Sequence, residues 1–241
     1  MKKTILLLVF LQVFFSCNGQ STKSLKNDYV QKMEFGLEGS VKEVTTYVCK
    51  VENGNIPTDK TKYYGKMIKQ FDIQGNALKI QDQWDMGELG KSESLSIYSG
   101  KGRAISFKDI VHFKEEAATE LNYKYDWSDN YHYTIAATDK SPYLTFITLD
   151  KDYRLSKIVF KNGNEIQVTQ EFERIYKENK VWEIKETITD YNDGEKTITY
   201  QIQVVQKYDQ YGNPTVVYSY NGLDKQQFEN VLFTEYQYYE K

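Results

Sequence analysis

The stretch "TITYQIQVVQKYDQYGNPTVV", residues 197–217, contains the two patterns that decide the fold. Its first half alternates between apolar side chains, such as Ile198 and Ile202, and polar threonines and glutamines. A period of two is typical of a β-strand with one buried face. Its second half holds turn residues, at 209–213, and then a second β-rich run. We therefore predict two antiparallel strands joined by a tight turn.

The turn in this stretch has a counterpart earlier in the chain, because "FDIQGNALKI" and "YDQYGNPTVV" both read aromatic-Asp-x-x-Gly-Asn. The aspartate can accept backbone N–H bonds at the start of a type I turn, and the glycine can take the left-handed position that follows, with a bulge. "LDKDYRLSKI", from Leu149, is predicted to be a third copy without the glycine. We expect these residues to act structurally, as hairpin turns and not as a binding loop. The predicted turn residues are Asp72, Gly75, Asn76, Asp209, Gly212 and Asn213.

Aromatic-Asp-x-x-Gly resembles the core of the YD repeat found in RHS-type proteins. The opening "LEGSVKEVTTYV", residues 37–48, is similar to the start of the mature domain in many uncharacterised, YD-repeat-like envelope lipoproteins. Asn76 and Asn213 stand where arginine is common in RHS repeats, and closed RHS shells need far longer chains. The resemblance covers residues 37–241 and implies an antiparallel meander of hairpins. It implies no activity.

The composition agrees with many strands, since the chain has 21 tyrosines and 12 phenylalanines but only 3 prolines. Its mean hydropathy of −0.66 indicates that each strand has one wet face. We predict a mainly all-β protein, an antiparallel meander forming a twisted open sheet, sandwich-like or half-barrel, with at most one or two short helices. Residues 108–121 place apolar side chains at spacings of three and four, which fits either a short amphipathic helix or a twisted strand pair.

The first residues form a short positive start followed by an apolar run, residues 5–15, that is too short to cross a hydrocarbon core of about 30 Å. The run fits the h-region of a secretory signal peptide. With Ser16 and Cys17 it resembles a bacterial lipoprotein signal, which implies acylation of Cys17 and anchoring in the cell envelope. Asn18 in place of an acidic residue favours the outer membrane. An ordinary secretory leader, with Cys17 incidental, is the alternative.

The predicted organisation is a signal peptide at 1–16, a lipidated N-terminus and tether at 17–36, and an antiparallel β domain at 37–241. Cys49 is then the one remaining thiol and is expected to be a small buried strand residue. A net charge of −3 without a basic run makes nucleic acid an unexpected partner.

A search for catalytic and metal-binding patterns yields no candidate. His112 and His132 lack the spacing of a zinc site, and neither a phosphate-binding loop nor a nucleophile motif occurs. We therefore predict no catalytic residues, no metal, no cofactor and no enzymatic activity.

The functional prediction is a lipid-anchored, non-enzymatic structural or binding protein of the bacterial envelope, whose protein or glycan partner the sequence does not identify. The tyrosines at alternate positions predict cross-strand aromatic ladders or an exposed aromatic binding face. One alternative is a carrier or chaperone that holds lipid or unfolded protein in the concave face of the sheet. An envelope hydrolase is a further alternative.

Overall fold

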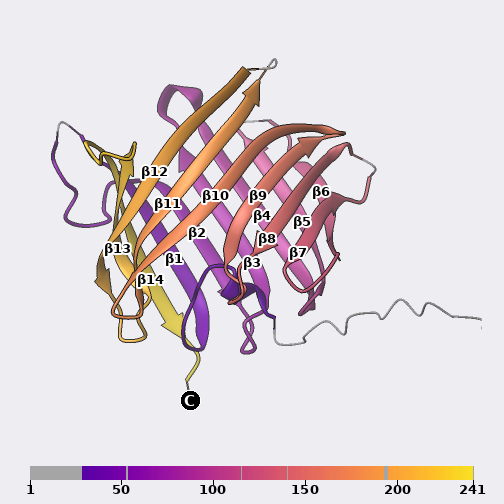
Figure 1. Ribbon diagram of the computed structural model, residues 1–241, viewed down its shortest axis with the longest axis horizontal. Coiled ribbons are helices and arrows are strands. Elements are labelled where there is room, and N and C mark those ends of the chain that lie inside the picture. Colours follow the sequence, from indigo (N-terminus) through magenta and orange to yellow (C-terminus); the bar gives the residue numbers. More distant parts are fainter. Residues whose placement is uncertain (1–28, 53, 115, 140, 193–194, 241) are drawn as a thin grey trace, which may run out of the picture.

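The computed structural model describes residues 29–52, 54–114, 116–139, 141–192 and 195–240 (Figure 1). Within these ranges the chain is all-β, with fourteen strands and two three-residue 3-10 helices, η1 (Gln31–Met33) and η2 (Gly87–Leu89). The strands are β1 (Val41–Lys50), β2 (Tyr63–Phe71), β3 (Ala77–Asp85), β4 (Lys91–Lys101), β5 (Ala104–Phe113), β6 (Thr119–Trp127), β7 (His132–Ala137), β8 (Tyr143–Leu149), β9 (Leu155–Asn162), β10 (Glu165–Lys177), β11 (Lys180–Asn192), β12 (Glu195–Tyr208), β13 (Pro214–Asn221) and β14 (Gln227–Tyr238).

Each strand pairs antiparallel with the next strand in the sequence, and β14 pairs with β1, so the sheet is a closed barrel. The closing register runs from Val41 opposite Tyr238 to Lys50 opposite Asn230. The all-β meander expected from the sequence is confirmed, but the open sheet, sandwich or half-barrel is wrong. Closure removes both sheet edges, whose unpaired backbone groups would otherwise remain exposed.

The helix considered for residues 108–121 does not form. Residues 104–113 belong to β5 and residues 119–127 belong to β6, and the two strands pair from Val111 opposite Thr119 to Ser106 opposite Lys124. The strand pair is therefore the correct reading of that segment.

The inner face of the barrel can be identified from side chains that meet across non-adjacent strands. Val44 of β1 and Tyr98 of β4 belong to one buried cluster, although β2 and β3 lie between their strands. Tyr98 also packs against the buried cluster that contains Tyr29, Tyr133 and Ile147, so these side chains share one interior, on the concave side of the sheet. The alternate aromatic residues of β4 to β7 share this face, and Phe107 stacks on Tyr123 with ring centroids 4.9 Å apart. The aromatic ladder of β4 to β7 thus faces the barrel interior, whereas Tyr218 and Tyr220, which both contact the Phe228 ring, lie in the outward-facing register.

The outer face carries ion pairs between neighbouring strands. Lys108 on β5 pairs with Glu120 on β6 at 2.5 Å. Lys157 on β9 pairs with Glu171 on β10 at 2.7 Å. All four side chains are more than a third exposed and alternate with inward-facing neighbours. The outer wall therefore carries charged pairs on β5, β6, β9 and β10, and it also exposes apolar side chains such as Ile97 and Ile198.

We call the end of the barrel where β1 begins and β14 ends the base, and the opposite end the rim. Residues 29–40, the plug, close the base, and they form the indigo segment at the lower end in Figure 1. Tyr29 is 1% exposed and packs in one cluster with Ile105, Tyr133 and Ile147. The expected tether at 17–36 therefore differs from the structure in its last part, because residues from Tyr29 onward pack against the barrel.

Candidate binding pocket at the base of the barrel

The two predicted turn motifs lie at the base and share one hydrogen-bond pattern. The Asp72 N–H donates to the Asn76 carbonyl at 2.8 Å, and the Asp209 N–H donates to the Asn213 carbonyl at 2.9 Å. Each aspartate side chain also accepts the backbone N–H of its asparagine. The glycines between them have φ of 97° and 91°, the left-handed region in which glycine carries no Cβ penalty.

The third copy, residues 150–154, repeats the pattern without a glycine. The Asp150 N–H donates to the Arg154 carbonyl at 2.8 Å, and the Asp150 carboxylate accepts the Arg154 N–H at 2.8 Å. Tyr153 takes the glycine's place with φ of 61°. Arg154 consequently occupies the position that Asn76 and Asn213 hold in the other turns.

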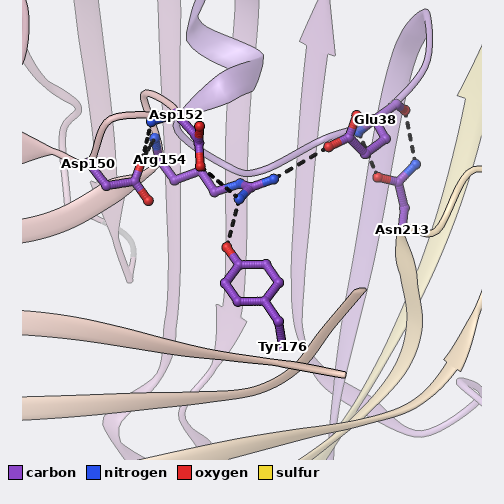
Figure 2. A network of polar contacts seen from close by, with 6 residues as sticks. All are labelled: Glu38, Asp150, Asp152, Arg154, Tyr176 and Asn213. Atoms are coloured by element: carbon purple, nitrogen blue, oxygen red, sulfur yellow. Dashed lines mark hydrogen bonds and ion pairs between the residues drawn. The ribbon is translucent and has the colours of Figure 1, made fainter. Parts of the chain in front are cut away.

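These turns hold the plug in place (Figure 2). Asn213 accepts a hydrogen bond from the Glu38 N–H at 2.8 Å, and its amide nitrogen donates to the Glu38 carbonyl at 3.0 Å. The Lys32 N–H donates to the Gly75 carbonyl at 3.0 Å. The Leu155 N–H donates to the Glu34 carbonyl at 3.1 Å. All three copies of the turn therefore hold the plug through backbone or side-chain hydrogen bonds.

The plug also introduces a carboxyl group into an aromatic environment. The Tyr133 hydroxyl donates to Glu34 Oε1 at 2.7 Å, and the Tyr29 hydroxyl donates to the same oxygen. Removal from water raises the pKa of Glu34 to about 7, although both tyrosine hydrogen bonds act in the opposite direction. Glu34 therefore holds its proton over more of the acidic range than an exposed glutamate does.

A pocket of about 340 Å³ lies between the plug and the lower parts of β10 to β13. The plug contributes Phe35 and Glu38, and the turn between β8 and β9 contributes Arg154. We call this space the basal pocket. Its remaining lining residues are Gly36 of the plug and, from β10, β11, β13 and their turns, Arg174, Tyr176, Glu178, Asn179, Lys180, Val181, Ile184, Tyr211, Gly212 and Pro214.

Arg154 lies in the wall of this pocket and contacts both β10 and the plug. Its Nη1 donates to the Tyr176 hydroxyl at 2.6 Å, and its Nη2 lies 3.5 Å from Glu38 Oε1 (Figure 2). Asp152 is a second carboxylate, 3.7 Å from Nη1. Both ion pairs are long and partly exposed, so each is worth little on its own. Their role is to position Arg154 beside Tyr176.

Arg174, on β10, is the less compensated cation of the pocket. Its Nη1 donates to the Leu155 carbonyl at 2.6 Å, which leaves the rest of the guanidinium without a protein hydrogen bond among the described residues. No ion pair reaches Arg174 in this part of the chain. Burial lowers the pKa of Arg174, and the charge of nearby Arg154 lowers it further, against an opposing effect of Asp150.

The pocket also exposes aromatic surface. Phe35, Tyr176 and Tyr211 are 40%, 44% and 39% exposed, although aromatic side chains of this size are usually covered. With Val181 and Ile184 they give the pocket apolar walls beside its cations. The arrangement can bind a group that accepts hydrogen bonds and carries an apolar part.

The structure brings only part of the predicted site together. Gly212 lines the basal pocket, while Asp72, Gly75 and Asn76 lie in the neighbouring turn beside the plug. Cys17 lies outside the described residues. The sequence analysis missed Arg154. Its position in the third copy of the turn, equivalent to Asn76 and Asn213, could have identified it. The sequence analysis also missed Arg174, for which a single arginine on an alternating strand gave no signal.

Among the described residues no group of histidine, cysteine, aspartate or glutamate is arranged to hold a metal ion. In the same residues, no helix has the length and apolar character needed to cross a membrane.

Comparisons with known proteins give no family. No family model matches the sequence, and no curated protein matches it. A solved structure described as a porin-like protein from Bacteroides uniformis is similar in part, with a TM-score of 0.46 and 10% identity, over 83% of this chain and 99% of that chain. At those values the similarity supports no conclusion about function.

Proposed function

We propose that this protein is a lipid-anchored, non-enzymatic binding protein of the bacterial cell envelope, and that the basal pocket is its binding site. The observation that carries the binding role is the guanidinium of Arg174, which is partly buried, faces the pocket and has no ion-pair partner among the described residues. Partial burial disfavours the charged guanidinium, and Asp150 compensates its charge only from a distance and not in a direct ion pair. A ligand that supplies an acceptor there would therefore be stabilised.

The leader and Cys17 support the anchor, because they resemble a lipoprotein signal. The outer face supports a position beside the membrane and not within it. A barrel that crosses a bilayer presents an apolar band to lipid, whereas here the Lys108–Glu120 and Lys157–Glu171 pairs occupy the outer wall. Lipid at Cys17 would hold such a barrel at the membrane surface.

The anchor would also orient the molecule. Residues 18–28 separate Cys17 from Tyr29, and a chain of that length reaches at most about 40 Å. Because Tyr29 lies at the base, the basal pocket would be on the membrane side of the barrel.

The anchor is tested by fractionating cells that make either the wild-type protein or Cys17→Ala. The wild type is expected with the membranes and Cys17→Ala in the soluble envelope fraction. A Cys17→Ala protein that stays in the membranes would refute the lipid anchor and would favour a barrel embedded in the bilayer.

The binding role is tested by thermal unfolding of the full chain against a panel of small carboxylates, phosphates and sugars. We expect at least one compound to raise the midpoint for the wild type and not for Arg174→Gln. Lys207→Gln, an exposed charge change on β12, is the matched control. A panel without any Arg174-dependent shift would contradict the proposed site.

A carrier of apolar molecules is a second candidate, favoured by one observation at the rim. Val111, Phe113, Tyr143 and Phe160 share the inward-facing register, yet each is more than a third exposed. The upper interior thus presents apolar surface. The test measures the binding of dodecanol. Weaker binding in Phe113→Gln and Phe160→Gln, with unchanged binding in Arg174→Gln, would support this candidate. Dodecanol binding unchanged in both rim variants would exclude it.

A further inference from the structure

We infer that the basal pocket receives a carboxylate group attached to a compact apolar body. This inference rests on the binding role proposed above and adds the chemistry of the ligand. It follows from the donors that the pocket offers, from the charges around them and from the apolar walls.

The donors come from two guanidinium groups, and Lys180, whose Nζ lies 5.2 Å from the centre of the Tyr208 ring, adds a third cation to the lining. Arg174 uses Nη1 for the Leu155 carbonyl, and no other described residue accepts from its guanidinium. Arg154 donates to Tyr176 through Nη1 and makes only a long contact to Glu38 through Nη2. Guanidinium groups present paired N–H donors in a plane, which matches the two oxygens of a carboxylate or the oxygens of a phosphate.

The surrounding charges decide between these two anions. Glu38 and Glu178 line the pocket together with the cations, and Asp152 lies 3.7 Å from Arg154. These three carboxylates offset the three cations Arg154, Arg174 and Lys180, so they repel an anion more strongly as its charge grows. A carboxylate has one negative charge, whereas a phosphate monoester has nearly two at neutral pH. A single negative charge is therefore favoured in this pocket.

The walls specify the rest of the ligand. Phe35, Val181 and Ile184 line the pocket from the plug and β11, and Tyr176 adds an exposed ring. The volume of about 340 Å³ lies at the small end of the range of ligand pockets. An aromatic or short branched body fits these walls and this volume.

The test uses the full chain in a non-ionic detergent and measures binding by titration calorimetry. The probes are 3-phenylpropanoate, the uncharged 3-phenylpropanol and inorganic phosphate. We expect 3-phenylpropanoate to bind at least about tenfold more tightly than either of the others, the effect expected for charge-assisted hydrogen bonds. Tighter binding of phosphate, or equal binding of the alcohol, would overturn the carboxylate.

Two variants connect binding to the pocket. Arg174→Gln is expected to weaken 3-phenylpropanoate at least about tenfold and to leave the alcohol unchanged. Arg174→Lys keeps the charge but loses the planar pair of donors, and should lie between the two. Lys207→Gln should match the wild type. Equal affinity in Arg174→Gln and the wild type would refute the site.

The outcomes separate this inference from the proposed function. If a sugar or phosphate stabilises the wild type but not Arg174→Gln, the pocket binds a ligand but the carboxylate assignment is wrong. If no compound depends on Arg174, both fail. The probes applied to the wild type give a result even if a variant does not fold.

Discussion

A single buried asparagine connects three parts of this barrel. Asn213 is 1% exposed and bonds to the backbone of Glu38 on both sides, and its amide nitrogen also donates to the Tyr238 hydroxyl at 2.8 Å. The β12–β13 turn, the plug and the last strand therefore meet at one side chain. A buried amide whose donors and acceptor are all satisfied contributes to stability and fixes the geometry around it.

Asn213→Ala should lower the free energy of unfolding by about 2–4 kcal/mol, because the side-chain hydrogen bonds to Glu38, Tyr238 and Asp209 are lost and the Glu38 backbone groups remain without their partners. Urea unfolding followed by circular dichroism measures the change. Asn164→Ala, at an exposed turn position, is the control and should stay within about 0.5 kcal/mol of the wild type. Equal effects of the two substitutions would contradict the role of Asn213.

Glu34 should make stability depend on pH. Its pKa is about 7 in the folded protein and near 4.5 in the unfolded chain, so the folded state binds the proton more tightly. The contribution of Glu34 to the free energy of unfolding is therefore greatest below about pH 4.5. It falls as the pH rises and levels off above about pH 7.

Glu34→Gln should remove that decline while keeping the uncharged hydrogen-bonding shape of the side chain. Unfolding free energies measured from pH 5 to pH 8.5 would show a flatter profile for the variant than for the wild type. Glu88→Gln, an exposed residue in η2, should retain the wild-type profile. Identical slopes in Glu34→Gln and the wild type would rule out Glu34 as the source.

Individual residues also show which contacts can be predicted from the sequence and which cannot. The hydrogen bonds of Asp72 and Asp209 follow local rules, which the turn spacing contains. The contact of Asn213 with Glu38 spans 175 positions, and no local pattern specifies it. Arg174 was not predicted for the same reason, since its importance depends on which groups the folded chain leaves beside it.

At the scale of the strands, β2 and β3 make a contact that depends on the absence of a side chain. Gly65 lies opposite Trp84, and a Cβ at Gly65 would come within 2.3 Å of the indole ring. The indole therefore lies over the glycine backbone on the inner face. This pairing is an aromatic rescue of a strand glycine.

Gly65→Ala should destabilise the protein by about 1–3 kcal/mol, because the ring has to move out of its place in the strand pair. The double variant Gly65→Ala with Trp84→Leu should cost less than the sum of the two single changes, which unfolding measurements can determine. Additive effects would show that the indole does not cover Gly65.

Residues 108–121 explain why one element remained ambiguous. Ile110 faces outward and Phe113 faces inward on β5, Ala117 lies in the connection between the strands, and Leu121 faces inward on β6. Apolar residues from both faces of one strand and from the connection thus fall at spacings of three and four, which are also those of a helix. The pattern within residues 197–208 had no such interruption and predicted β12 correctly.

For the whole molecule, closure is the property that the sequence did not predict. The hairpins follow from alternation and turns, but the β1–β14 pairing joins segments almost the whole described chain apart. Local patterns are the same for an open sheet and for a barrel. The curvature that brings the ends together belongs to all fourteen strands jointly.

Hydrogen exchange distinguishes the closed barrel from an open sheet. In β1, alternate amides bond to β2 and to β14, so consecutive amides from Val44 to Val48 should all exchange slowly. An open sheet would leave every second amide unprotected. Exchange is measured by nuclear magnetic resonance. Rapid exchange of every second amide would show that β1 and β14 are not paired.

The even number of strands in this barrel has a practical consequence for labelling it. The first strand starts and the last strand finishes on the same side, as the Val41–Tyr238 pair shows. With the lipid anchor proposed above, a fluorescent reporter fused after β14 would be confined between the protein and the bilayer, where it would compete for space. On the same proposal, a reporter inserted in the long β1–β2 connection would project from the opposite end of the barrel and leave the side of the anchor unobstructed.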